Sequence, residues 1–186
     1  MMKRIFLPIS LAVLLCLVAS SAVAQRSQHD PLTEKEVDQM REAADYPNKR
    51  LELIIGFAKE RLTSIDQLRA DSGAAAARPK KIHDLLEDFL TLIDETSDNV
   101  EMYESHRADM RKGLKLLIEA GSEWQLKLRQ LKEQSSPEEL AQYSFALTNA
   151  ADGVSDMAKD ARDTLQEQNK LAQEKQLIKD YSLRKD

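Results

Sequence analysis

The stretch of sequence that decides the fold is IHDLLEDFLTLIDETSDNVEMYESH, from Ile82 to His106. It carries eight carboxylates and no lysine or arginine. Its apolar residues recur in alternating steps of four and three, and the same stepping keeps its phase as far as Leu131. A 3.5-residue repeat of this kind is typical of helices that pack as in a coiled coil. Because no proline occurs between Pro79 and Pro137, we expect one helix over about residues 80–133.

Three of the fifteen repeat positions carry residues that suit an apolar core poorly, namely Thr96, Arg107 and Gly121. A break near Thr96 to Asn99 would divide the long helix into two. The chain would then form a four-helix up-and-down bundle. We keep this architecture as the alternative to a bundle of three long helices.

Local signals also predict a helix before this stretch. Thr33 and Glu36 have the spacing of a capping box, so a first helix is expected over about 33–71. Pro47 should kink that helix or make it restart, because proline removes a hydrogen bond from a helix interior. Residues 71–79 include aspartate, serine, glycine and proline, a composition that favours a linker between two helices.

The last helix has the clearest start. Ser136 is a good N-cap and Pro137 suits the first helical position, so this helix is expected over about 137–175. Residues 179–186 should fray, since the apolar pattern fades before them. The predicted fold is therefore all-α: an elongated antiparallel bundle of three long helices with coiled-coil-like packing, forming a single domain over 32–178.

Charged residues predict the register of both hairpins. Three cations of the middle helix should face three carboxylates of the last helix, and four cations of the first helix should face carboxylates of the middle one. Exposed pairs contribute only about 0–1 kcal/mol each, but they help to select one register. The first set pairs Arg107, Arg111 and Lys115 with Asp163, Asp160 and Asp156. The second pairs Lys49 and Arg50 with Glu101 and Glu104, and Lys59 and Arg61 with Asp88 and Asp94.

The N-terminus has the pattern of a secretory signal peptide. Lys3-Arg4 is basic, Ile5–Val18 is apolar, and Ala22-Val23-Ala24 matches a cleavage site for small residues. We expect residues 1–24 to be removed, leaving 25–31 as a flexible mature N-terminus. The mature protein should be exported to the periplasm or the extracellular space, without stable insertion in a membrane.

Composition excludes several classes of function. Cys16 is the only cysteine and lies in the signal region, so the mature chain can form no disulfide and no thiolate site. The formal charge is −5, and it becomes −7 when Lys3 and Arg4 are removed. A net acidic chain argues against binding to nucleic acids or to an anionic membrane surface.

Metal, haem and catalytic sites have little support in the sequence. His83 and Glu87 have the spacing that can chelate a metal, but both lie on the polar face of the helix, whereas metal sites in bundles use inward-facing ligands. Haem would need inward ligands such as Met110 and Met157, which are expected to fill the core. No nucleophile motif or phosphate-binding glycine loop occurs. We predict no metal, no cofactor and no enzymatic activity.

The sequence favours an exported, non-enzymatic helical bundle that acts through contacts with another protein. Its role would be that of a scaffold, an adaptor or a modest chaperone, with a protein partner recognised by charge pattern. One alternative is a metal- or haem-binding bundle. A second is a self-associating coiled coil, in which Leu53, Leu116 and Leu126 would form the contact between copies.

Overall fold

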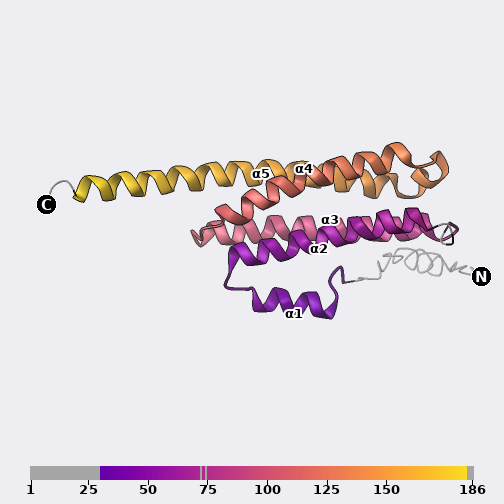
Figure 1. The fold of residues 1–186 in the computed structure, drawn as a ribbon, viewed down its shortest axis with the longest axis horizontal. Coiled ribbons are helices and arrows are strands. Elements are labelled where there is room, and N and C mark those ends of the chain that lie inside the picture. Colours follow the sequence, from indigo (N-terminus) through magenta and orange to yellow (C-terminus); the bar gives the residue numbers. More distant parts are fainter. Residues whose placement is uncertain (1–29, 72, 74, 184–186) are drawn as a thin grey trace, which may run out of the picture.

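The computed structural model describes residues 30–71, 73 and 75–183, and within them the chain is helical without any strand (Figure 1). The predicted all-α class is confirmed, but the expectation of three long helices is wrong, because five helices pack together. The signal peptide and most of the predicted flexible segment lie outside the described residues. The five helices are α1 (Glu34–Glu42), α2 (Pro47–Ala70), α3 (Arg78–Ser105), α4 (Arg111–Gln134) and α5 (Pro137–Leu183).

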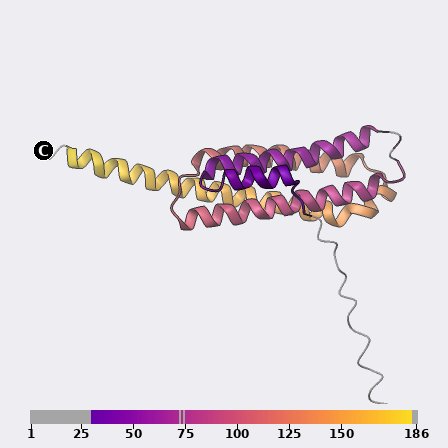
Figure 2. The same cartoon turned by 90° about the horizontal axis from the view of Figure 1, so that it is seen from below.

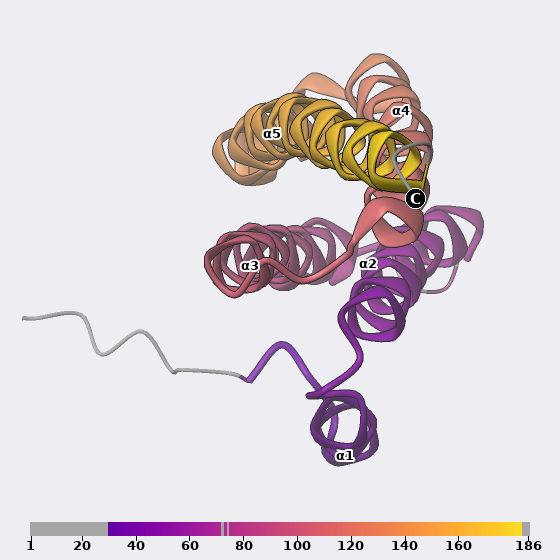
Figure 3. The same cartoon turned by 90° about the vertical axis from the view of Figure 1, so that its left-hand side faces the viewer.

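The four long helices form a bundle in which consecutive helices run in opposite directions (Figure 1). Helix α2 packs against α3 and α4, and α5 also packs against α3 and α4. Helices α3 and α4 therefore occupy opposite corners, and the chain crosses the end of the bundle between them (Figure 3). As a result α3 and α5 are neighbours that run in the same direction.

The break between α3 and α4 falls at residues 106–110, ten residues after the place considered in the sequence. Arg107 has a φ of 55°, a left-handed conformation that ends helices. The N–H of Arg107 donates to the carbonyl of Glu104 at 2.8 Å, and the N–H of Ala108 donates to that of Tyr103 at 3.0 Å. These two bonds form a Schellman motif, so α3 stops at this point.

Two distant side chains hold the start of α4. The amide of Gln168, in α5, accepts from the N–H of Met110 and donates to the carbonyl of Ala108, both at 3.0 Å. The amide of Asn48, in α2, accepts from the N–H of Gly113 at 2.7 Å and donates to the carbonyl of Asp109 at 2.7 Å. The first amides of a helix lack partners within it, and here the neighbouring helices supply them.

At Pro47 the helix restarts rather than kinks, which was one of the two predicted outcomes. Helix α1 ends at Glu42, and Pro47 is the first residue of α2, a position in which its missing N–H costs nothing. Thr33 caps α1 with the predicted capping box. The short α1 then folds back along α2, on the outside of the bundle (Figures 1 and 3).

The apolar repeat did predict which face of α3 and α4 is buried. Fourteen of its fifteen positions are buried, and Arg107 in the break is the exception. Trp124 lies in this core, as expected, with its ring edge-to-face with Phe89 at a centroid distance of 5.4 Å. The repeat keeps its phase across the break, and so the break is invisible in the periodicity.

Helix α5 is longer than expected and continues to Leu183. Its last turns extend beyond the end of the bundle (Figures 1 and 2). Leu177 and Ile178 are 69% and 70% exposed there. This end of α5 is a helix with apolar side chains that no other described element covers.

Candidate functional site: the groove between α3 and α5

Helices α3 and α5 approach closely because one of them carries a glycine at the contact. A Cβ atom on Gly153 would lie 2.9 Å from Cδ1 of Leu90 and 3.7 Å from Cγ2 of Ile93. Gly153 therefore aligns α5 with this part of α3. Since the two helices are parallel, residues further along both chains stay level with each other.

Carboxylates of the two helices meet across this contact. Asp98 and Asp160 differ by 62 in residue number, as do Glu101 and Asp163, so each pair lies at one level. All four residues are exposed, and they border one cavity. Each level thus places like charges on both sides of the groove. Such pairs repel each other and destabilise the packing of the two helices.

The cavity has an apolar floor and an acidic rim, with a volume of about 330 Å³. Its floor consists of side chains that belong to the hydrophobic core and are almost fully buried. Thr164 also lines the cavity and is 8% exposed. We name this site the acidic groove and define it by its lining residues. The floor residues are Val100, Leu117, Met157 and Ala161, and the rim carboxylates are Asp98, Glu101, Glu104, Asp160 and Asp163.

Little positive charge compensates the acidic groove. Within the described residues, Lys159 is the only cation in an ion pair with a rim carboxylate, at 3.8 Å from Asp160 and 3.7 Å from Asp163. Its side chain is well exposed to solvent, which screens both pairs. Nearby, desolvation and then the charge of Asp98 raise the pKa of the Asp94 carboxyl. The groove is therefore a surface of excess negative charge.

The expected ion pairs between α4 and α5 do not form. The guanidinium of Arg111 binds Asp109 at 2.6 Å instead of Asp160, and this bond lowers the pKa of Asp109 to about 2. Arg107 and Lys115 make no ion pair within the described residues. The three carboxylates that were predicted to face these cations lie elsewhere. Asp160 and Asp163 border the acidic groove, and Asp156 is exposed one helical turn earlier on α5.

The first hairpin forms one cross-helix ion pair, in another register. Arg50 approaches Glu95 at 3.6 Å rather than Glu101 or Glu104, and it also donates to the carbonyl of Met40. Lys49 lies 3.9 Å from Glu52 on its own helix. Without the cations expected beside them, Glu101 and Glu104 are left on the acidic groove.

Arg61 has a different role from the predicted one. It donates to both oxygens of Glu36, at 2.9 and 2.8 Å, and to the carbonyl of Pro31, so it fastens α1 to α2. Burial is the largest single influence and would raise the pKa of Glu36, but the bonds from Arg61 and Thr33 together outweigh it, so the pKa is lowered. Lys59 and Asp94, from the same predicted set, are exposed and form no ion pair within the described residues. The pKa of Arg61 is raised first by its bonds to Glu36 and also by the nearby charges of Glu36 and Asp88, so Asp88 lies close enough to act on Arg61 as predicted.

The metal candidates lie apart from this groove. His83 is half-buried with Nδ1 at 3.6 Å from Asp84, and Glu87 makes no contact with it through its carboxylate. Across the described ranges, no three histidine, cysteine, aspartate or glutamate side chains lie in a position to share a metal ion. Met110 and Met157 are both buried in the core. Within the described ranges, therefore, no three rim carboxylates of the acidic groove lie together as metal ligands.

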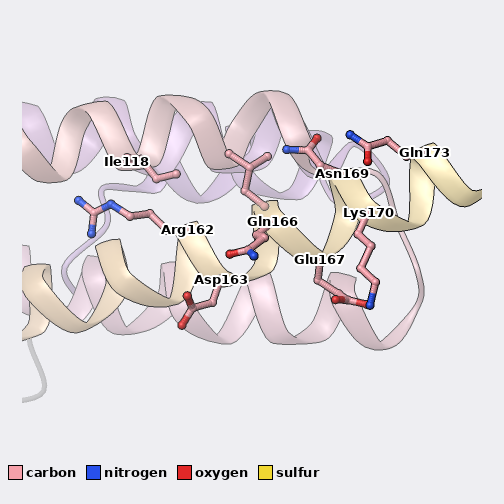
Figure 4. A pocket seen from close by; sticks show the side chains of 9 residues that line it. Ile118, Arg162, Asp163, Gln166, Glu167, Asn169, Lys170 and Gln173 are labelled. Atoms are coloured by element: carbon pink, nitrogen blue, oxygen red, sulfur yellow. The ribbon is translucent and has the colours of Figure 1, made fainter.

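Two other hollows border α5. The larger, about 680 Å³, lies beside Ile118 of α4, and its polar side chains diverge: Asp163 and Glu167 extend from one side of α5, whereas Asn169 and Gln173 extend from the other (Figure 4). The second, about 480 Å³, lies where α5 passes the α3–α4 connection and has Leu171 on its wall. The polar groups of the first diverge, and the second places Arg107, Arg111 and Lys175 beside carboxylates, so neither has the single sign of charge that the acidic groove has.

Sequence reasoning found four of the rim carboxylates individually and missed the site that they form. Glu101, Glu104, Asp160 and Asp163 were assigned to cationic partners on other helices. Thr164 is buried, and nothing in the local sequence distinguishes it from an ordinary core threonine. The missing information was the adjacency of α3 and α5, which depends on the diagonal connection.

No helix within the described residues has a stretch apolar and long enough to cross a bilayer. Comparison of the chain with protein-family models, with curated proteins and with solved structures gave no significant match.

Proposed function

We propose that this protein is an exported, non-enzymatic helical bundle that binds another protein through the acidic groove. The partner would present a positively charged segment, and the protein would act as a scaffold, an adaptor or a modest chaperone. The observation that supports this most is the alignment of carboxylates on both sides of the groove. Only one exposed lysine pairs with them within the described residues.

Like charges on two packed helices lower the stability of the bundle. A cationic partner would remove that repulsion, and the resulting gain would appear as binding free energy. The rim residues are exposed and the floor is apolar, so a partner can use both charge and hydrophobic contact. Charge complementarity of this kind increases association rates and sets specificity.

Export is part of the same proposal and rests on residues 1–24. Expression of the full chain in a secreting bacterial host tests it directly. The mature protein should appear outside the cytoplasm with Gln25 as its first residue. Full-length protein retained in the cytoplasm would argue against export.

Binding can be tested with a basic peptide, an acidic peptide and fluorescence anisotropy. The basic peptide should bind, and its affinity should fall as salt is raised. A groove variant that combines Asp98→Asn, Glu101→Gln, Asp160→Asn and Asp163→Asn should lose most of this binding. Its matched control carries Glu60→Gln, Glu119→Gln, Glu123→Gln and Glu133→Gln, four exposed residues on α2 and α4, and removes the same net charge.

The control variant should bind as the unmodified protein does. Equal losses in both variants would mean that net charge alone attracts the peptide, and the groove would then have no special role. Absence of binding by any basic peptide at low salt would contradict the proposed function.

Self-association is a second candidate, supported by the uncovered end of α5. Leu171, Leu177 and Ile178 are all exposed there, whereas Leu53 and Leu116 are half-buried. Exposed apolar residues on an extended helix suit contact with another helix. Light scattering should then show a dimer that Ile178→Glu dissociates, and a monomer at high concentration would contradict this candidate.

A further inference from the structure

We infer that the acidic groove holds the side chain of a lysine from the partner protein, in preference to an arginine. This inference rests on the proposed function and adds the chemical identity of the group that enters the cavity. Three features of the cavity support it: the hydroxyl of Thr164, the apolar floor, and the carboxylates beside that hydroxyl.

Thr164 differs from the other helical threonines of the described chain. Thr63, Thr91, Thr96 and Thr148 each donate to the backbone carbonyl four residues earlier. Thr164 makes no such bond, and within the described residues its hydroxyl has no hydrogen-bond partner. Thr164 is only 8% exposed to solvent. It lines the cavity of the acidic groove, and its exposed surface faces that cavity. Its hydroxyl oxygen is not one of the fully buried polar atoms of the described chain, so it stays open to the cavity and can accept a hydrogen bond from a group that enters.

Two rim carboxylates line the same cavity as this hydroxyl. Asp160 is four residues before Thr164 on α5 and therefore lies on the same face of the helix. Glu101, on α3, lines the same cavity from the other side. An ammonium group has three hydrogen-bond donors, and these match one hydroxyl oxygen and two carboxylates on different helices.

The apolar floor distinguishes a lysine side chain from a simple cation. A lysine has a four-carbon stem that can lie on the side chains of Val100, Met157 and Ala161 while its charge stays at the rim. A metal ion would need converging carboxylates, and the described residues provide no such group. The guanidinium of arginine is a planar fork that suits a single carboxylate held flat against it. Oxygen atoms spread over two helices suit the ammonium better.

The test compares two peptides of equal charge, one with lysine and one with arginine at every basic position. In isothermal titration calorimetry the lysine peptide should bind about tenfold tighter than the arginine peptide, the difference expected from a hydrogen bond to a charged group. Thr164→Val removes the hydroxyl at nearly constant volume. It should weaken lysine-peptide binding about tenfold and leave arginine-peptide binding within about twofold.

Two controls accompany that variant. Thr164→Ser keeps the hydroxyl and should retain the preference for lysine. Thr148→Val changes an exposed threonine elsewhere on α5 and should alter neither affinity. Circular dichroism melting of each variant verifies that it is folded. A spermine competitor shows whether a free polyamine fills the site better than a peptide does.

The outcomes separate the two levels of the proposal. Equal affinity for the two peptides, or no effect of Thr164→Val, overturns the lysine inference and leaves the proposed function in place. Tighter binding of spermine than of the lysine peptide overturns the assignment to a partner protein. If neither peptide binds, the proposed function itself fails.

Discussion

The connection between α3 and α4 depends on Gln168, and the substitution Gln168→Ala measures that dependence. The amide accepts from the N–H of Met110 and donates to the carbonyl of Ala108. Each hydrogen bond contributes about 1 kcal/mol, and the N–H of the fully buried Met110 would lose its partner at a further cost of about 1 kcal/mol. We therefore expect Gln168→Ala to reduce the free energy of unfolding by about 2–3 kcal/mol.

The matched control is Gln166→Ala, on the same helix. Gln166 is exposed and makes no hydrogen bond within the described residues, so its replacement changes only helix propensity. For a chain of 186 residues, the difference between the two variants should be roughly 5–10 °C in melting temperature. Urea denaturation followed by circular dichroism gives the free energies, and hydrogen exchange should show lost protection at residues 106–112.

A third variant separates hydrogen bonding from packing. Gln168→Glu can still accept from Met110 but cannot donate to Ala108, and it places two oxygen atoms together. It should be at least as destabilising as Gln168→Ala near neutral pH. If Gln168→Ala and Gln166→Ala unfold at the same midpoint, Gln168 does not hold the connection and the reasoning is refuted.

Four further predictions address other parts of the molecule. Gly56→Ala should stabilise the protein by about 0.5–1 kcal/mol, because a new Cβ there meets nothing within 4 Å. Gly113→Ala should instead destabilise it by about 1 kcal/mol, because its Cβ would lie 2.8 Å from Cδ1 of the buried Leu51. Urea denaturation measures both, and shifts of the same sign would contradict the close packing of α2 on α4. Arg107→Gly should stabilise by about 0.5 kcal/mol or more by relieving the positive φ, and an unchanged or lower midpoint would argue against that strain. Since the pKa of Glu36 lies below its ordinary 4.5, its ion pair should stabilise α1 above that pH and be lost as pH falls through the lowered pKa. The protection of α1 amides from hydrogen exchange should fall over the same pH range. Glu36→Gln should remove this pH dependence and weaken the packing of α1 on α2 by about 2 kcal/mol. Asp98→Asn should raise the free energy of unfolding by about 0.5–1 kcal/mol, because it removes repulsion between carboxylates within α3. It should also weaken binding of the basic peptide. A variant that loses both stability and binding would contradict the repulsion.

The sequence was sufficient to predict the buried faces and most helix starts. Burial depends on the spacing of apolar residues, which is local, so the repeat from Ile82 to Leu131 identified the core positions of two helices. The capping box at Thr33 and the start at Pro137 are also local, and both are present in the structure.

The break at 106–110 could not be predicted in the same way. The position that takes a left-handed conformation is Arg107, without the glycine that usually marks a helix end. The partners of the first amides of α4 are Asn48 and Gln168, which are 65 and 58 residues away from the groups that they bind. The glycine of a usual helix end is therefore missing from the break, and Met110 rather than a polar residue occupies the N-cap of α4; the local signal is Asp109, which accepts from the N–H of Arg111 at 3.1 Å.

The pairing of charges failed for a related reason. A charge pattern predicts contacts only once the neighbours of each helix are known. With one uninterrupted middle helix, Glu101 would face the first helix and Asp160 would face the second half of the middle one. The diagonal connection places α3 beside α5 instead, and the acidic sides of both helices meet.

The end of α3 at Ser105 gives the acidic groove a direction. A helix carries about half a negative charge at its C-terminus, and the last turn of α3 contains no basic residue to offset it. Helix α5 runs on past this level, so it adds no opposing pole there. The cations that line the hollow beyond Glu104, namely Arg107, Arg111 and Lys175, offset that pole, so the attraction for a cation should be strongest near Asp98 and Glu101 and weaken toward Glu104. A bound segment whose positive charges are concentrated at one end would take one orientation, and a peptide of the reversed sequence would not be equivalent.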